Sequence, residues 1–147
     1  MKKEKHRSVI VQYWWSKAEE SLASGHREFE AGSYTFAMNR LYYAVFYGVC
    51  AILLERAHSF KKHSGVRSAF HREFIKTGLL DVKYGKLYDQ LFEDRQEGDY
   101  IALTSFEPEY VTFQLEQAAE FLERLRPLIS SLPEHNATES EQSQDKK

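Results

Sequence analysis

Two arginines lie in segments whose other residues predict packed helices, and their side chains could carry chemistry. Arg40 belongs to an aromatic, almost wholly apolar segment, residues 34–47, and Arg95 begins the segment Arg95-Gln-Glu-Gly-Asp99-Tyr100. A buried charge without a partner is strongly destabilising, so an arginine in a core helix needs an anion beside it. Two such positions in a small helical domain indicate a polar site built into a bundle.

The pair Arg95 and Asp99 has two interpretations. The two residues are four positions apart, which places them one turn apart on a helix. In the first interpretation they form a structural clamp that ties the helix end to the next loop. In the second, the fork-shaped guanidinium of Arg95 binds phosphate, and Tyr100 supplies a hydrogen bond or a stacking surface. Spacing alone favours the clamp.

A second polar feature runs along the aromatic helix. Arg40, Tyr43 and Tyr47 recur at i, i+3 and i+7, so they form a seam on one face of an otherwise apolar helix. We include all three residues in the candidate site.

The sequence lacks the common catalytic and cofactor motifs. It has no glycine-rich phosphate loop, no His-Glu-x-x-His motif, no paired cysteines and no nucleophile elbow. The pair His26 and Glu30, and the neighbours His63, His71 and Glu73, do not amount to the three or four converging ligands of a metal site. We therefore expect neither a metal nor a cofactor.

Length and composition favour a single domain in a reducing compartment. The 147 residues suffice for one domain with its own core, and the formal net charge of −2 gives no overall basic field that would indicate nucleic-acid binding. Cys50 has no cysteine partner and is expected to be a small core residue, which fits a cytoplasmic location. We expect no export signal and no membrane span.

Apolar spacing predicts helices over most of the chain. The first is expected from about residue 9 to 31, with an interruption near Gly25. The second is expected at 34–56; it is apolar on two faces, which is typical of a central helix.

Three further helices are expected after the central one. Ser64 caps a short helix that ends at Gly78, and Asp81 caps a long one that Gly98 ends. Pro108 lies in the first turn of the last helix. The predicted fold is all-α, an antiparallel up-and-down bundle of four long helices plus one short helix.

The predicted domain boundaries follow from these helices. Residues 1–8 form a basic N-terminal extension, residues 9–130 form the helical bundle, and residues 131–147 form a disordered polar tail with almost nothing to bury.

Four motifs together resemble one known family. They are Asn39-Arg40-Leu-Tyr-Tyr43-Ala-Val-Phe, His63-Ser-Gly-Val66, Phe74-Ile-Lys-Thr-Gly78-Leu-Leu and Arg95-Gln-Glu-Gly-Asp99-Tyr100. In order and spacing they resemble the HEPN superfamily, and more narrowly its small free-standing prokaryotic members. The resemblance covers residues 14–128.

The resemblance implies a dimeric helical bundle that is often encoded beside a minimal nucleotidyltransferase, as a toxin–antitoxin pair. Active members are metal-independent ribonucleases with an arginine followed, after four to six residues, by a histidine; two such motifs face each other across the dimer. The arginine would polarise the phosphate, and the histidine would assist attack by the 2′-hydroxyl, leaving a cyclic phosphate. Here the arginine corresponds to Arg95, whereas Tyr100, Ile101 or Ala102 stands where the histidine is expected.

This departure favours binding over cleavage, because tyrosine is a poor general base at neutral pH. We predict a non-catalytic or weakly active dimeric subunit that is partnered with a minimal nucleotidyltransferase. It is predicted to bind nucleotide or RNA through Arg40, Tyr43, Tyr47, His63, Arg95, Asp99 and Tyr100.

Two alternatives stay open. One is a metal-independent endoribonuclease toxin in which Arg95 and Tyr100 are the catalytic residues of an altered Arg-x4-Tyr motif. The other is a purely structural dimerisation scaffold. In the toxin systems of the family the partner can adenylylate a tyrosine near the motif, so the resemblance also makes Tyr100 a candidate acceptor.

Overall fold

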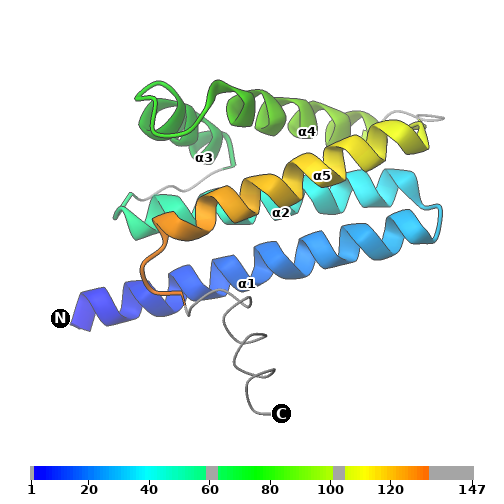
Figure 1. The fold of residues 1–147 in the computed structure, drawn as a ribbon. Coiled ribbons are helices and arrows are strands. Elements are labelled where there is room, and N and C mark those ends of the chain that lie inside the picture. Colours follow the sequence, from blue (N-terminus) through cyan, green and yellow to red (C-terminus); the bar gives the residue numbers. More distant parts are fainter. Residues whose placement is uncertain (1, 59–62, 101–104, 133–147) are drawn as a thin grey trace, which may run out of the picture.

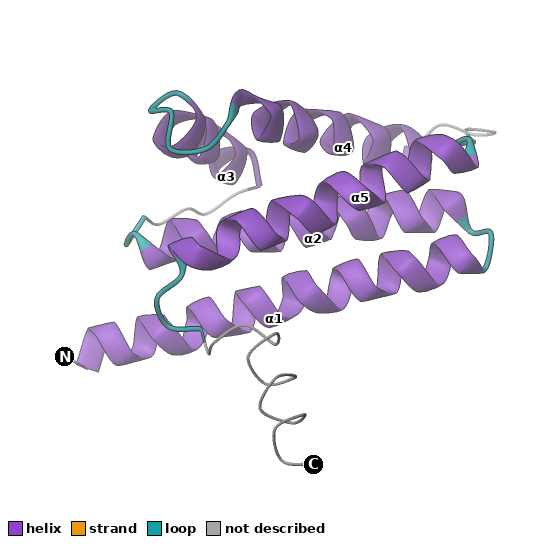
Figure 2. Cartoon of the chain, in the orientation of Figure 1, coloured by secondary structure: helices purple, strands orange, loops and turns teal. Residues whose placement is uncertain are grey.

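The chain folds into an antiparallel bundle of helices (Figure 1). The structure is a computed structural model that describes residues 2–58, 63–100 and 105–132, and it contains no strand within these ranges (Figure 2). The helices are α1 (Lys2–Glu30), α2 (Tyr34–Glu55), α3 (His63–Phe70), α4 (Val82–Tyr100) and α5 (Pro108–Leu125). The four long helices alternate in direction, and α3 is the short one. The predicted fold class is confirmed.

Helix α1 is longer than the sequence suggested. It begins at Lys2, so residues 2–8 are helical and continuous with the rest of α1. Gly25 does not interrupt it. A Cβ atom added at Gly25 would lie 3.0 Å from Cδ2 of Leu41, so the missing side chain lets α1 pack closely against α2. The prediction of a break at Gly25 is wrong because this glycine serves a helix crossing.

Helix α2 is the centre of the bundle, as its two apolar faces predicted. It contacts α1, α3, α4 and α5. Among the described helices it also has the length and apolar composition that could cross a membrane, but most of that stretch is buried, as in the core of a bundle. Arg40 does not share this burial: the expectation that it is buried is wrong, since its side chain is exposed beside α1.

The segment between α2 and α4 turns the chain back along the bundle. After α3, residues His71–Ile75 form a π-helical turn, and Gly78 adopts a positive φ of 81°. Oδ1 of Asp81 accepts a hydrogen bond of 2.9 Å from the backbone N–H of Lys83, so Asp81 caps α4 as predicted.

Helix α4 continues through Gly98 to Tyr100. A Cβ atom at Gly98 would lie 3.0 Å from Cγ2 of Thr35 and 3.3 Å from Cε2 of Phe106. This glycine therefore allows close packing at one end of the bundle, and the prediction that it ends the helix is wrong.

The buried thiol of Cys50 makes the stability of the bundle sensitive to alkaline pH. Burial raises the pKa of this thiol from 9.0 to about 12. The folded state then keeps a proton that the unfolded chain releases, so the unfolded state binds fewer protons and stability falls as pH rises above 9. The expected slope is about 1.4 kcal/mol per pH unit.

We predict that Cys50→Ala removes the thiol's share of this loss, so that stability falls less steeply between pH 9 and pH 10 than in the unmodified chain. Both proteins should still lose stability as the pH approaches and passes 10, because burial also raises the pKa values of the Tyr42 and Tyr88 phenols above 10.0. Urea unfolding at a series of pH values measures both slopes. Identical slopes for the two proteins between pH 9 and pH 10 would contradict the prediction.

Candidate functional site

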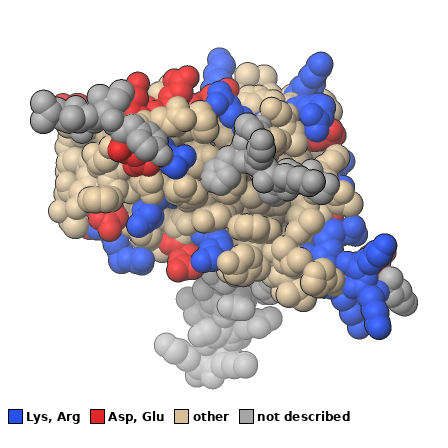
Figure 3. Space-filling view, turned by 180° about the vertical axis from the view of Figure 1, so that it is seen from behind, with Lys and Arg blue, Asp and Glu red and all other residues tan. Residues whose placement is uncertain are grey.

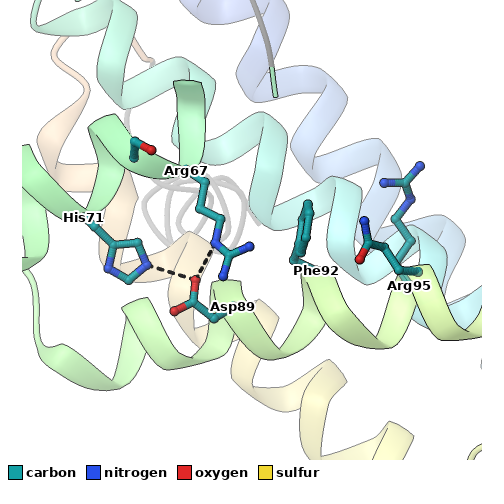
Figure 4. Close-up of a pocket in the computed structure, with 7 residues that line it drawn as sticks. Arg67, His71, Asp89, Phe92 and Arg95 are labelled. Atoms are coloured by element: carbon teal, nitrogen blue, oxygen red, sulfur yellow. Dashed lines mark hydrogen bonds and ion pairs between the residues drawn. The ribbon is translucent and has the colours of Figure 1, made fainter. Parts of the chain in front are cut away.

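A pocket between α3 and α4 holds the main cluster of functional groups (Figure 4). It has a volume of about 720 Å³, within the usual range for small-molecule sites. Its lining residues are Arg67, Ser68, His71, Asp89, Phe92, Arg95 and Gln96.

Asp89 organises one side of this pocket. Nε of Arg67 donates a hydrogen bond of 2.8 Å to Oδ1 of Asp89, and Nε2 of His71 lies 3.0 Å from the same oxygen. The guanidinium carbon of Arg67 also lies 4.6 Å from the centroid of the Phe92 ring, a cation–π contact. These contacts fix the Arg67 side chain while leaving its terminal nitrogens without a hydrogen bond to any described residue.

Arg95 forms the other side of the pocket, and Figure 4 shows the ring of Phe92 between the side chains of Arg67 and Arg95. The guanidinium carbon of Arg95 lies 5.2 Å from the ring centroids of both Tyr42 and Tyr43, and only 17% of the side chain is exposed. Two aromatic faces thus hold a cation at the edge of the pocket.

The predicted pair of Arg95 and Asp99 is present. Nε of Arg95 lies 3.3 Å from Oδ2 of Asp99. This nitrogen is buried and forms no hydrogen bond with a described residue, so the contact is an ion pair without good hydrogen-bond geometry. Arg95 therefore combines features of both interpretations. Its Nε is paired with Asp99, as in a structural clamp, and its side chain also lines the pocket, as a phosphate-binding group would.

Asp99 also connects Arg95 to Arg40. Nδ2 of Asn39 donates a hydrogen bond of 3.3 Å to Oδ2 of Asp99, and Nη1 of Arg40 donates one of 2.8 Å to Oδ1 of Asn39. A chain of polar contacts thus runs from the α3–α4 pocket to the exposed side of α2.

The predicted seam of Arg40, Tyr43 and Tyr47 lines a different depression, which we call the α1–α2 groove. Its volume is about 370 Å³. Its α1 side is lined by Lys17, Glu20, Ser21, Ser24 and Arg27. Arg95 and the predicted seam therefore line two different hollows, and Asp99 lines neither of them. The contact between Arg95 and Tyr43 lies between the two hollows.

His63 and Tyr100 are the first residue of α3 and the last residue of α4. Their side chains lie outside the part of the chain that the structure describes in detail, and their roles stay predictions.

Four residues of the pocket were not predicted to form one site: Arg67, His71, Asp89 and Phe92. The i, i+4 spacing of Arg67 and His71 places them on one helix face, which was a usable signal. No local pattern, however, links Asp89 to α3. A π-helical turn starts at His71, and such turns are frequent at functional sites.

The charges around the α3–α4 pocket favour an anion. Two arginines line it against one carboxylate, that of Asp89. Elsewhere, on the face seen in Figure 3, basic and acidic side chains are interspersed, which agrees with a net charge near zero. Both arginines are also ion-paired through Nε, Arg67 with Asp89 and Arg95 with Asp99, so the pocket offers guanidinium donors more than a net positive charge. Guanidinium groups suit phosphate.

Comparison with known proteins agrees with the fold. The family model described as "HEPN domain" matches residues 11–128. A "UPF0332 protein" of Thermotoga maritima is 43% identical over 123 residues, which cover 84% of this chain and 93% of the relative. "Putative toxin MJ0142" of Methanocaldococcus jannaschii is 36% identical over 115 residues, which are 78% of each chain. "Putative toxin MJ0605" of the same organism is 30% identical over 117 residues, 78% of this chain and 85% of the relative.

Proposed function

The chain belongs to the HEPN domain family, and on this premise we propose that it is a toxin-related subunit that binds the phosphates of single-stranded RNA in the α3–α4 pocket. The observation that carries the proposal is the convergence of Arg67 and Arg95 on one pocket with a single carboxylate. The names of two relatives, "Putative toxin MJ0142" and "Putative toxin MJ0605", support the toxin-related part.

The same residues support binding more than rapid cleavage. Tyr100, Ile101 or Ala102 stands where the motif histidine is expected, and tyrosine is a weak base at neutral pH. The guanidinium of Arg95 is already held by Asp99 and two tyrosine rings, an arrangement suited to a fixed binding group. The subunit is therefore proposed to be non-catalytic or weakly active.

Fluorescence anisotropy with a labelled single-stranded RNA tests this function. The full chain should bind the RNA, and added salt should weaken the complex because bound phosphates displace counterions. A chain that leaves the anisotropy unchanged at any protein concentration would refute RNA binding.

The proposed assembly is a homodimer with a minimal nucleotidyltransferase as its partner, and Tyr100 is the proposed adenylylation acceptor. Co-expression with a nucleotidyltransferase encoded beside this gene, followed by affinity purification and mass spectrometry, tests both parts. Failure of the two proteins to co-purify would refute the proposed partner. An unmodified mass for the peptide that contains Tyr100 would refute its role as the acceptor.

One structural observation favours a second function, RNA cleavage. His71 lines the same pocket as Arg95, and Asp89 contacts its Nε2, as a carboxylate that orients a catalytic imidazole would. In that reaction the 2′-oxygen bonds to phosphorus as its proton passes to Nδ1 of His71, the ring nitrogen that Asp89 does not contact. The bond from phosphorus to the 5′-oxygen breaks, and that oxygen takes a proton from water.

Cleavage predicts that His71→Ala preserves RNA affinity while lowering activity by about 100-fold or more. Gel analysis of RNA incubated with each protein measures the rate, and anisotropy measures the affinity. Intact RNA after incubation with the unmodified chain would remove the enzyme hypothesis and leave the binding function untouched.

A further inference from the structure

We propose that the α1–α2 groove is a second phosphate-binding site, which holds the continuation of an RNA strand bound at the α3–α4 pocket. The proposal rests on the proposed function. It assigns a role to α1, a helix that contributes nothing to the pocket around Arg95.

The groove concentrates positive charge. Lys17, Arg27 and Arg40 line it, whereas Glu20 is its one carboxylate. None of the three cations forms an ion pair with a described carboxylate, although such pairs occur elsewhere on the described surface, as between Lys83 and Glu120. Three positive side chains around one hollow repel one another, and a bound phosphate would relieve that repulsion.

The groove also offers neutral hydrogen-bond donors. Ser21 and Ser24 lie on the same face of α1 as Lys17, and Tyr43 and Tyr47 lie opposite on α2. Burial raises the pKa of the Tyr47 phenol above 10.0, so this hydroxyl keeps its proton at neutral pH and can donate to a phosphate oxygen. A groove of cations and hydroxyl donors matches an oxyanion ligand.

A close helix crossing builds this arrangement. A Cβ atom at Gly25 would lie 3.0 Å from Leu41 and 3.6 Å from Cβ of Arg40, so glycine at this position brings Arg40 against α1. Trp14 stacks on Tyr47 with ring centroids 5.6 Å apart and fixes the far end of the seam.

The two hollows are neighbours. The guanidinium of Arg95, which lines the pocket, lies on the ring of Tyr43, which lines the groove. Arg40 reaches Asp99 through Asn39 in the same region. A strand whose phosphate sits at Arg95 is proposed to pass over Tyr43 toward Arg40. The short separation of the two hollows is why we propose a longer RNA as the ligand rather than a separate small anion.

The test compares a dinucleotide with a dodecanucleotide RNA. The double variant Lys17→Ala/Arg27→Ala should bind the dodecanucleotide about tenfold more weakly than the unmodified chain. The slope of the logarithm of the binding constant against the logarithm of the salt concentration should also become less negative, by about 0.7 for each phosphate that the variant no longer binds. Its affinity for the dinucleotide should be unchanged. The matched control, Lys76→Ala/Lys86→Ala, removes the same charge from exposed lysines outside the groove.

The outcomes separate this proposal from the function on which it rests. If the two double variants bind the dodecanucleotide equally well while Arg95→Ala still weakens binding, the second site in the groove is refuted and the function proposed for the pocket is not. An unmodified chain that binds neither RNA would refute both. Circular dichroism of each variant checks that the bundle is intact.

Discussion

Replacing Arg95 by alanine is expected to weaken RNA binding by about 100-fold, because it removes a guanidinium that can donate two charge-assisted hydrogen bonds to one phosphate. The side chain is held by Tyr42 and Tyr43 at the edge of the pocket, so little conformational freedom is lost when a ligand binds. Anisotropy titrations with the same RNA measure the change in affinity.

Three comparisons show whether that change belongs to the pocket. Arg95→Lys keeps the charge without the fork and should bind about tenfold more weakly. Arg72→Ala removes an arginine whose side chain is 62% exposed and does not line the pocket, so it should change affinity little. A structural scaffold predicts the opposite pattern: Arg95→Ala would lower the melting temperature and leave RNA affinity at its original value.

The helices and their order could be predicted from the sequence because the spacing of apolar residues indicates which helix faces are buried. The central position of α2 and the cap at Asp81 both follow from local patterns, and the structure contains both. The glycines were misread. Gly25 and Gly98 look like breaks in the sequence, yet each allows another helix or loop to approach closely. Which of these effects applies depends on the neighbouring element, and local sequence does not specify it.

The candidate site was harder to predict, because it too depends on which elements pack against one another. Arg95 and Asp99 could be paired from their spacing, since one helix carries both. Arg40 could not be placed, because the apolar residues around it predict burial while the crossing with α1 leaves it exposed. Asp89 meets Arg67 and His71 only once α3 packs on α4. Pairings across helices depend on that packing.

Phe70 connects α3 to two other helices of the bundle. Its side chain is fully buried, its ring stacks on Tyr88 of α4 at 5.5 Å, and it meets Phe121 of α5 edge-on at 5.8 Å. Helix α3 spans 8 residues, too few to be stable without tertiary packing. The positions of Arg67 and His71 therefore depend on this aromatic contact.

Phe70→Ala is accordingly expected to lower the free energy of unfolding by about 3–5 kcal/mol, the usual cost of deleting a buried phenylalanine. Phe113→Ala, at a side chain that is 55% exposed, should cost about 0.5 kcal/mol or less. Urea unfolding measures both. Phe70→Leu keeps most of the buried volume and should stay folded, with weaker RNA binding as α3 shifts on α4. If Phe70→Ala unfolds at the same urea midpoint as the unmodified chain, other contacts hold α3 in place and the pocket does not depend on this ring.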